Sequence, residues 1–247
     1  MIRRFYIENY KSFRKTDVYF QPLTIIFGPN AAGKSNLFDA INLLSRMVSE
    51  RSLKEAFAGH RGLPLESVHI GPANQSRQGK TDYYRMAFEI DLELSPNTIR
   101  EVENRVRMLR KGLDDAPSKE VKIITNPLLR YRIELEVSPE TGETRVCNER
   151  LVALRLSGDG EKSRGAFLEK IPDSKNSSKI SLRLEGQARP THFDVGLNYT
   201  VVSTELYAPH YPHITAFREE IKRCNIFYFE PRELMREASA IADIERP

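Results

Sequence analysis

The chain has 247 residues, of which 40% are hydrophobic and 29% are charged, and its formal net charge is +4. No apolar run approaches the roughly 20 residues that a membrane-spanning helix needs, so we expect no membrane partner. The 2 cysteines, Cys147 and Cys224, exclude a disulfide framework or a cysteine-rich metal site and favour a reduced, cytoplasmic location. The weak positive charge permits a nucleic-acid partner without requiring one.

The N-terminal part is predicted to begin with strands. Residues 2–7 and 17–20 are two short strand candidates joined by the polar turn 8–16. The next apolar run, Leu23-Thr24-Ile25-Ile26-Phe27, is short and rich in β-branched residues. These properties are typical of a buried strand.

A phosphate-binding loop follows that run. Residues 28–35 read Gly-Pro-Asn-Ala-Ala-Gly-Lys-Ser, which matches the pattern G-x-x-x-x-G-K-[ST]. Four apolar residues then recur at helical spacing: Leu37, Ile41, Leu44 and Val48. Strand, loop and helix are the context that this motif requires, so we expect a nucleoside triphosphate and Mg²⁺ to bind here.

The loop residues have distinct chemical tasks. Gly28 and Gly33 let the backbone curl around the β-phosphate, and the small Ala31 and Ala32 keep the loop clear of it. The N-terminus of the following helix presents unpaired N–H groups to the same phosphates. We expect Lys34 to reach the β- and γ-phosphates as the candidate catalytic residue, and the Ser35 hydroxyl to ligate Mg²⁺.

The middle of the chain changes its period. Residues 50–82 are rich in glycine and proline and are predicted to form loops with short elements. Apolar residues then alternate with polar ones over 86–94 and 129–137, which predicts half-buried antiparallel strands. A turn at 139–142 leads into a strand near 145–156, and weaker strand candidates lie at 168–171 and 180–184.

Two helices are predicted among these strands. The first, near 97–111, carries Ile99, Val102, Val106 and Leu109 on one face, with Gly112 as its stop. Its arginines suit phosphates, but Glu101 and Glu103 stand four residues before Arg105 and Arg107, which favours a solvated face. The second helix, near 213–223, carries Ile214, Phe217 and Ile221 and precedes an apolar run, 226–229.

Hydrolysis of ATP needs an acidic residue at the end of a second strand, the Walker B position, and this sequence offers no good candidate. The run 226–229 ends at Glu230 without an Asp-Glu pair, and Asp91 falls on the polar face of its strand. Leu156-Ser157-Gly158-Asp159-Gly160-Glu161 resembles an ABC signature motif, but Gly-Asp-Gly favours a hairpin loop. No Asn-Lys-x-Asp motif for guanine occurs, which argues against a small GTPase.

The N-terminal sequence resembles a known group of ATPases. Tyr6-Ile7-Glu8-Asn9-Tyr10-Lys11-Ser12-Phe13 is similar to the start of SMC, RecF and related ABC-type ATPases. Residues 23–30, 33–37 and 39–41 continue the same pattern. Tyr131 and the stretch 149–151 extend the likeness, more loosely, to bacterial ATPases of the RecF-like and OLD-like group.

The resemblance implies an α/β fold, the N-terminal lobe of an ABC/RecF-type P-loop NTPase with an antiparallel β-subdomain and inserted helices. It implies that Lys11, Ser12 and Phe13 lie near the ribose or base, and Asn30 and Asn36 near the phosphates. The complete set of predicted nucleotide-binding residues is Lys11, Ser12, Phe13, Gly28, Pro29, Asn30, Ala31, Ala32, Gly33, Lys34, Ser35 and Asn36.

The resemblance also implies a domain plan. Residues 1–82 form the ATPase lobe, 83–230 an antiparallel β-rich part, and 231–247 the start of a C-terminal lobe that this sequence lacks. Two such heads enclose two ATP molecules, and each site is completed by the partner's signature motif.

The function expected is therefore an ATP–Mg²⁺-binding lobe that couples nucleotide state to dimerisation in DNA repair or defence against phage. Its expected partners are ATP, a second copy of the head, DNA, and a nuclease or other effector subunit. Without a Walker B acid, the chain alone is expected to bind ATP with little turnover. Two alternatives stay open, a small P-loop kinase and a nucleotide-sensing interaction module without turnover.

Overall fold

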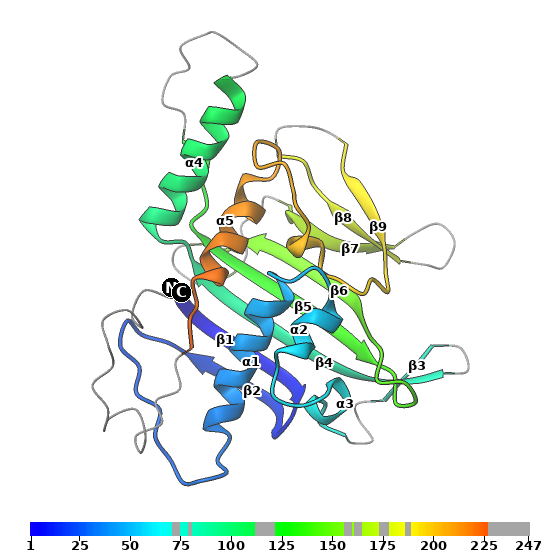
Figure 1. Ribbon diagram of the computed structural model, residues 1–247. Coiled ribbons are helices and arrows are strands. Elements are labelled where there is room, and N and C mark those ends of the chain that lie inside the picture. The colour runs from blue at the N-terminus through cyan, green and yellow to red at the C-terminus, as the bar shows by residue number, and fades with distance from the viewer. Residues whose placement is uncertain are drawn as a thin grey trace, which may run out of the picture.

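Figure 1 shows the computed structural model, a mixed α/β arrangement in which helices lie against a broad antiparallel sheet. The structure describes residues 1–70, 75–78, 81–111, 122–155, 160, 165–172, 178–185 and 189–226. Within these residues no helix is both long and apolar enough to cross a lipid bilayer. The α/β class and the antiparallel character expected from the sequence are both confirmed.

The strands of the sheet are distributed along the chain between residues 2 and 194. Its strands are β1 (Ile2–Tyr10), β2 (Phe13–Tyr19), β3 (Gln75–Gln78), β4 (Thr81–Glu93), β5 (Leu128–Val137), β6 (Thr144–Ala153), β7 (Leu168–Pro172), β8 (Ser178–Leu182) and β9 (Thr191–Asp194). Their order is β2-β1-β4-β5-β6-β7-β8-β9, with β3 paired to β4. The sheet joins strands from both sides of residue 82, and the predicted domain boundary there stays a prediction.

The helices are α1 (Lys34–Met47), α2 (Leu53–Ala58), α3 (Pro64–Ser67), α4 (Pro96–Lys111) and α5 (Pro212–Lys222), and a 3₁₀ helix spans Val201–Ser203. In Figure 1, α1, α2 and α5 lie over one face of the sheet, whereas α4 projects beyond its edge. The three predicted long helices are confirmed to within two residues at their observed ends.

The core lies between α1, α5 and the sheet, because alternate strand residues point to that face. Phe5 of β1 stacks on Phe88 of β4 with 6.2 Å between ring centroids, and Tyr131 of β5 lies 4.9 Å from Phe217 of α5. All four side chains are fully buried. The period-2 pattern of the sequence therefore identified the strand residues that face the helices.

The opposite face of the sheet carries ion pairs. Arg130 on β5 makes two hydrogen bonds to Asp91 on β4, at 2.6 and 2.7 Å. Arg4 on β1 contacts Glu89 at 2.6 Å. Asp91 therefore serves as the partner of an arginine on the polar face, as its alternation indicated, and it is not placed to hold a nucleotide-bound metal.

The first hairpin is tighter than predicted. β1 continues to Tyr10 and β2 begins at Phe13, so the turn is Lys11-Ser12 rather than residues 8–16. Asn9 and Lys11 adopt left-handed backbone conformations, with φ of 54° and 46°, which reverse the chain within this short space. The polar residues in 8–16 favoured a long turn, but every second residue of these strands faces away from the core and can be polar.

The predicted strand 23–27 is wrong for the described residues, where this segment is irregular and pairs with no strand. Leu23, Ile25 and Phe27 are 81%, 77% and 90% exposed. A strand needs a neighbour to satisfy its backbone groups, and none of the described strands lies beside this segment. Its apolar composition alone could not supply that neighbour.

The charges on α4 are arranged differently from the sequence pattern. Glu103 contacts Arg107 at 3.1 Å, as predicted, but it also accepts hydrogen bonds from the backbone N–H groups of Ile123 and Ile124. Glu101 pairs with Arg223, just beyond α5, instead of Arg105. The predicted helix stop at Gly112, the signature-like residues 156–159 and 161, and Glu230 with most of the run before it lie outside the described residues.

Candidate functional site

The phosphate-loop residues 28–33 lead directly into α1. Three of them have left-handed or related backbone angles, with φ of 155° at Gly28, 64° at Ala31 and 93° at Gly33. Gly33 is the N-cap of α1, no side chain caps this end, and the first turn carries no acidic residue. The helix therefore begins with N–H groups and a partial positive charge available to an anion.

Ser12 and Phe13, from the end of the first hairpin, lie against the start of α1. A Cβ on Gly33 would stand 3.1 Å from the Phe13 ring and 3.2 Å from Ser12 Oγ. The Asn36 side-chain amide donates to Ser12 Oγ at 3.0 Å. Residues 12 and 13 are thus adjacent to Gly33, although they precede it by 21 and 20 positions in the sequence.

Lys34 folds back over the loop. Its ammonium group donates to the carbonyl oxygens of Gly28 and Pro29, both at 2.7 Å. These carbonyls hold the charge at the centre of the loop, where a phosphate would compete for it. The residues therefore fit a triphosphate by their chemistry: a cation, an uncapped helix start, and glycines that keep side chains out of the space.

The remaining predicted loop residues are open to solvent. Pro29, Asn30, Ala31, Ala32 and Ser35 are exposed. Ser35 lies in the first turn of α1, so its hydroxyl is accessible to a metal ion bound with the nucleotide. Within the described chain, no group of three His, Cys, Asp or Glu side chains forms a metal site. A Mg²⁺ ion here would depend on Ser35 together with nucleotide oxygens.

Lys11 lies beside the loop and pairs with Asp39, a contact that was not predicted from the sequence. Its ammonium group contacts Asp39 of α1 at 3.0 Å and donates to the Arg61 carbonyl at 3.0 Å. Asp39 is buried at 5% exposure. The sequence offered one signal of this pairing: Asp39 lies among the apolar helix residues Leu37, Ala40 and Ile41. A buried acid requires a partner.

A half-buried histidine extends this cluster. His60 Nε2 lies 2.9 Å from the hydroxyl of Tyr10, the last residue of β1. Burial, followed by the nearby Lys11 charge, lowers the pKa of His60 to about 4. His60 is therefore neutral near pH 7, and it links the first hairpin to the segment after α2 without adding charge beside the loop.

Replacing Gly33 by alanine is expected to destabilise the fold by about 2 kcal/mol, because a φ of 93° strains an L-residue and the new methyl group would press on Phe13 and Ser12. Gly142→Ala is the matched control, since its φ is 69° but nothing lies within 4 Å of the added Cβ. Urea unfolding should give a larger loss for Gly33→Ala than for Gly142→Ala. Equal losses would mean that the contacts with residues 12 and 13 do not shape the loop.

Comparison with known proteins gives a family match and several partial relatives. The family described as "AAA domain" matches residues 4–181. The DNA replication and repair protein RecF of Lactobacillus johnsonii is 28% identical over 106 residues, 42% of this chain and 26% of that protein. RecF of Corynebacterium jeikeium is 30% identical over 73 residues, 29% of this chain and 17% of that protein.

A chromosome protein matches as well. Structural maintenance of chromosomes protein 1 of Schizosaccharomyces pombe is 34% identical over 94 residues, 36% of this chain but only 7% of that protein. The matched part of the chain therefore spans about a quarter or less of the length of each of these relatives.

Proposed function

The chain belongs to the AAA domain family and is similar to RecF and SMC proteins, and from this premise we propose that residues 28–36 bind ATP with Mg²⁺. The observation that carries the proposal is the start of α1. There, an uncapped helix N-terminus, Gly28 and Gly33, and the ammonium group of Lys34 converge on one small space. This combination stabilises a bound phosphate group.

Further roles follow from the loop's neighbours. Phe13 and Ser12 lie against Gly33, so a nucleotide at the loop would have its sugar or base on the side of the first hairpin. Asn36, held by Ser12, would lie beside the phosphates. Lys11, bound to Asp39, would set the position of the hairpin against α1 rather than contact the phosphates directly.

We propose that the exposed segment 23–27 is completed by further strands when the nucleotide site is assembled. Leu23, Ile25 and Phe27 are too apolar and too exposed to remain uncovered in a working protein. The same assembly would supply the Walker B acid that the sequence lacks. Hydrolysis would then belong to the assembled head, and the chain alone would bind ATP with little turnover.

At the level of the whole protein, we propose an ATPase whose nucleotide state controls pairing of two heads, in the cytoplasm. The names of the RecF and SMC relatives support action on DNA, in repair, replication or chromosome maintenance. A nuclease or other effector partner, and a role against phage, are further proposals that rest on the likeness to the OLD-like group.

A small P-loop kinase is the alternative that the fold disfavours. Kinases of this type alternate strands with helices, whereas here every described pairing in the sheet is antiparallel. A nucleotide-sensing module without turnover would share the same loop, and it differs from the main proposal only in the activity of the assembled head.

The experiment that tests the proposal is calorimetric titration of the chain with ATP, with and without Mg²⁺. We expect saturable binding that Mg²⁺ strengthens by about tenfold, the scale of one good metal–oxygen or charge-assisted contact. Ser35→Ala should remove most of the Mg²⁺ effect, whereas Ser49→Ala, beyond the far end of the same helix, should not. Absence of binding in both conditions would contradict the proposal.

A further inference from the structure

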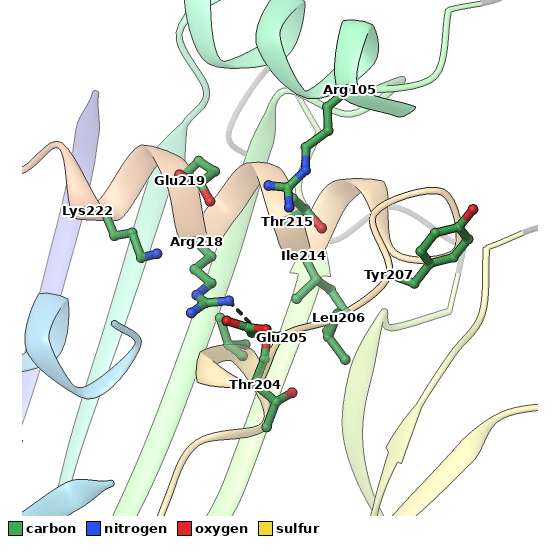
Figure 2. A pocket seen from close by; sticks show the side chains of 11 residues that line it. Arg105, Thr204, Glu205, Leu206, Tyr207, Ile214, Thr215, Arg218, Glu219 and Lys222 are labelled. Carbon is green, nitrogen blue, oxygen red and sulfur yellow. Dashed lines mark hydrogen bonds between the residues drawn. The ribbon is translucent and has the colours of Figure 1, made fainter. Parts of the chain in front are cut away.

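A pocket lies away from the phosphate loop, between α4, α5 and the segment 201–207. It is partly open to solvent and has a volume of about 460 Å³, within the range of sites for small ligands. One helical face of α5 lines it with Ile214, Thr215, Arg218, Glu219 and Lys222. Figure 2 shows Arg105 reaching from α4 toward α5, with Arg218 and Lys222 projecting from α5 itself.

None of the three cations in this pocket forms an ion pair with a described carboxylate, although Glu205 and Glu219 line the same pocket. Among the described residues, no ion pair involves Arg105, Arg218 or Lys222, whereas other arginines of the sheet and of α4 are paired. The one hydrogen bond at this cluster joins Arg218 Nη1 to the Thr204 carbonyl, at 3.1 Å. That bond fixes the guanidinium against the segment 201–207, and its acceptor is a neutral carbonyl rather than a carboxylate.

The pocket holds three cations and two carboxylates, so its lining carries a net positive charge. Arg218 and Lys222 are four residues apart on α5, where like charges repel and weaken a helix. Arg105 adds a third charge from α4, and the carboxylate best spaced to neutralise it, Glu101, pairs with Arg223 instead. An anionic group placed between these side chains would relieve the repulsion and make charge-assisted hydrogen bonds.

The other polar groups specify what the anion is attached to. Glu205 and Glu219 also line the pocket, and neither forms an ion pair with a described residue. Carboxylates accept hydrogen bonds from hydroxyl or amino groups. The hydroxyls of Thr204 and Tyr207 add further donors and acceptors. A ligand that suits both sets carries an anionic end and a hydroxyl-rich body.

We propose that this pocket binds a phosphomonoester of a polyhydroxylated molecule, a sugar phosphate or a nucleoside monophosphate. The phosphate lies among Arg105, Arg218 and Lys222, and the sugar hydroxyls face Glu205 and Glu219. The two carboxylates disfavour a nucleic-acid strand, because its successive phosphates would approach them as well as the cations. The volume of the pocket also suits a single small molecule.

The test is calorimetric titration of the whole chain with ribose 5-phosphate, AMP and inorganic phosphate. We expect saturable binding of ribose 5-phosphate, with AMP showing whether a base adds affinity. Arg105→Gln should weaken the binding of ribose 5-phosphate at least tenfold, because the substitution removes one charge-assisted contact with the ligand. It breaks no contact with a described residue. Arg100→Gln is the matched control, since Arg100 lies on the same helix and bonds only Asn97 there.

Each remaining outcome decides the matter. If none of the three probes binds, the site assignment is overturned. It is also overturned if Arg105→Gln and Arg100→Gln bind ribose 5-phosphate with equal affinity. If inorganic phosphate binds as tightly as ribose 5-phosphate, the assigned ligand class is wrong. Lys34→Ala should leave ribose 5-phosphate binding unchanged, so this pocket and the ATP proposal succeed or fail separately.

Discussion

Lys34→Ala is expected to weaken ATP binding by about a hundredfold. In the structure the Lys34 ammonium group lies over the loop, bonded to the Gly28 and Pro29 carbonyls at 2.7 Å each. A bound triphosphate would take this charge for its β- and γ-phosphates, and charge-assisted hydrogen bonds contribute about 1.5–3 kcal/mol each. Losing one such bond corresponds to a factor of about 10–100 in affinity, and losing two weak ones to about a hundredfold.

The measurement is calorimetric or fluorescence titration with ATP and Mg²⁺ on both proteins. Lys54→Ala is the control, because Lys54 is an exposed lysine on α2, away from the loop. The thermal midpoint of unfolding should change little in either variant, since the carbonyls that Lys34 releases are exposed. Equal ATP affinity in wild type and Lys34→Ala would show that the loop is not used.

Glu149 is expected to make stability fall as pH rises from about 5 to about 7. This side chain is fully buried and accepts hydrogen bonds from the backbone N–H groups of Val201 and Val202 at 2.7 and 3.1 Å, and from the Tyr131 hydroxyl at 2.9 Å. Burial raises its pKa to about 7 despite these donors. Through these hydrogen bonds the carboxyl group connects the 3₁₀ helix to the sheet.

The direction of the effect follows from proton binding. The folded state holds the Glu149 proton up to about pH 7, whereas the unfolded chain releases it near 4.5, so the folded state binds more protons between these values. The contribution is complete below about pH 4.5 and is lost as pH rises through about 7. Over this window the free energy of unfolding should fall by about 3 kcal/mol.

Glu149→Gln should abolish this pH dependence, because glutamine keeps the shape and does not ionise. The matched control is Glu136→Gln: burial opposes ionisation of Glu136, but Arg85 and Arg145 outweigh it and lower its pKa. Glu136 therefore loses its stabilising effect as pH falls, in the opposite direction. Urea unfolding at about pH 5 and pH 8 measures the effect of Glu149, and a further measurement at about pH 3 measures the opposite effect of Glu136. If wild type and Glu149→Gln have parallel pH profiles, the buried carboxyl group does not titrate as inferred.

The contacts of Glu149 could not be predicted from sequence motifs. The sequence around 149–151 entered only as a loose likeness, yet the fold brings Glu149 beside Val201 and Val202, which are distant along the chain. Such a pairing has no local signal. In the same way, the pairing of Lys11 with Asp39 comes from the fold, and the contact of Lys11 with a nucleotide stays a prediction.

The sequence by itself determined the features that depend on local spacing. The apolar stripe of α1 and the period-2 strands β4 and β5 could be predicted, because a helix repeats every 3.6 residues and a strand every two. The order Gly28 to Ser35 carries its own chemistry, since the glycines and the helix start are contiguous. The family likeness followed from the same short segments.

Only the tertiary structure decided the features that need a partner from elsewhere in the chain. The segment 23–27 has the composition of a strand, but strand formation requires a neighbouring backbone, and the described residues provide none. Glu101 was well spaced for Arg105, but the approach of α5 gave it Arg223 and left Arg105 facing a pocket. Burial, charge pairing and pocket formation depend on distances between remote segments, and spacing along the sequence does not contain those distances.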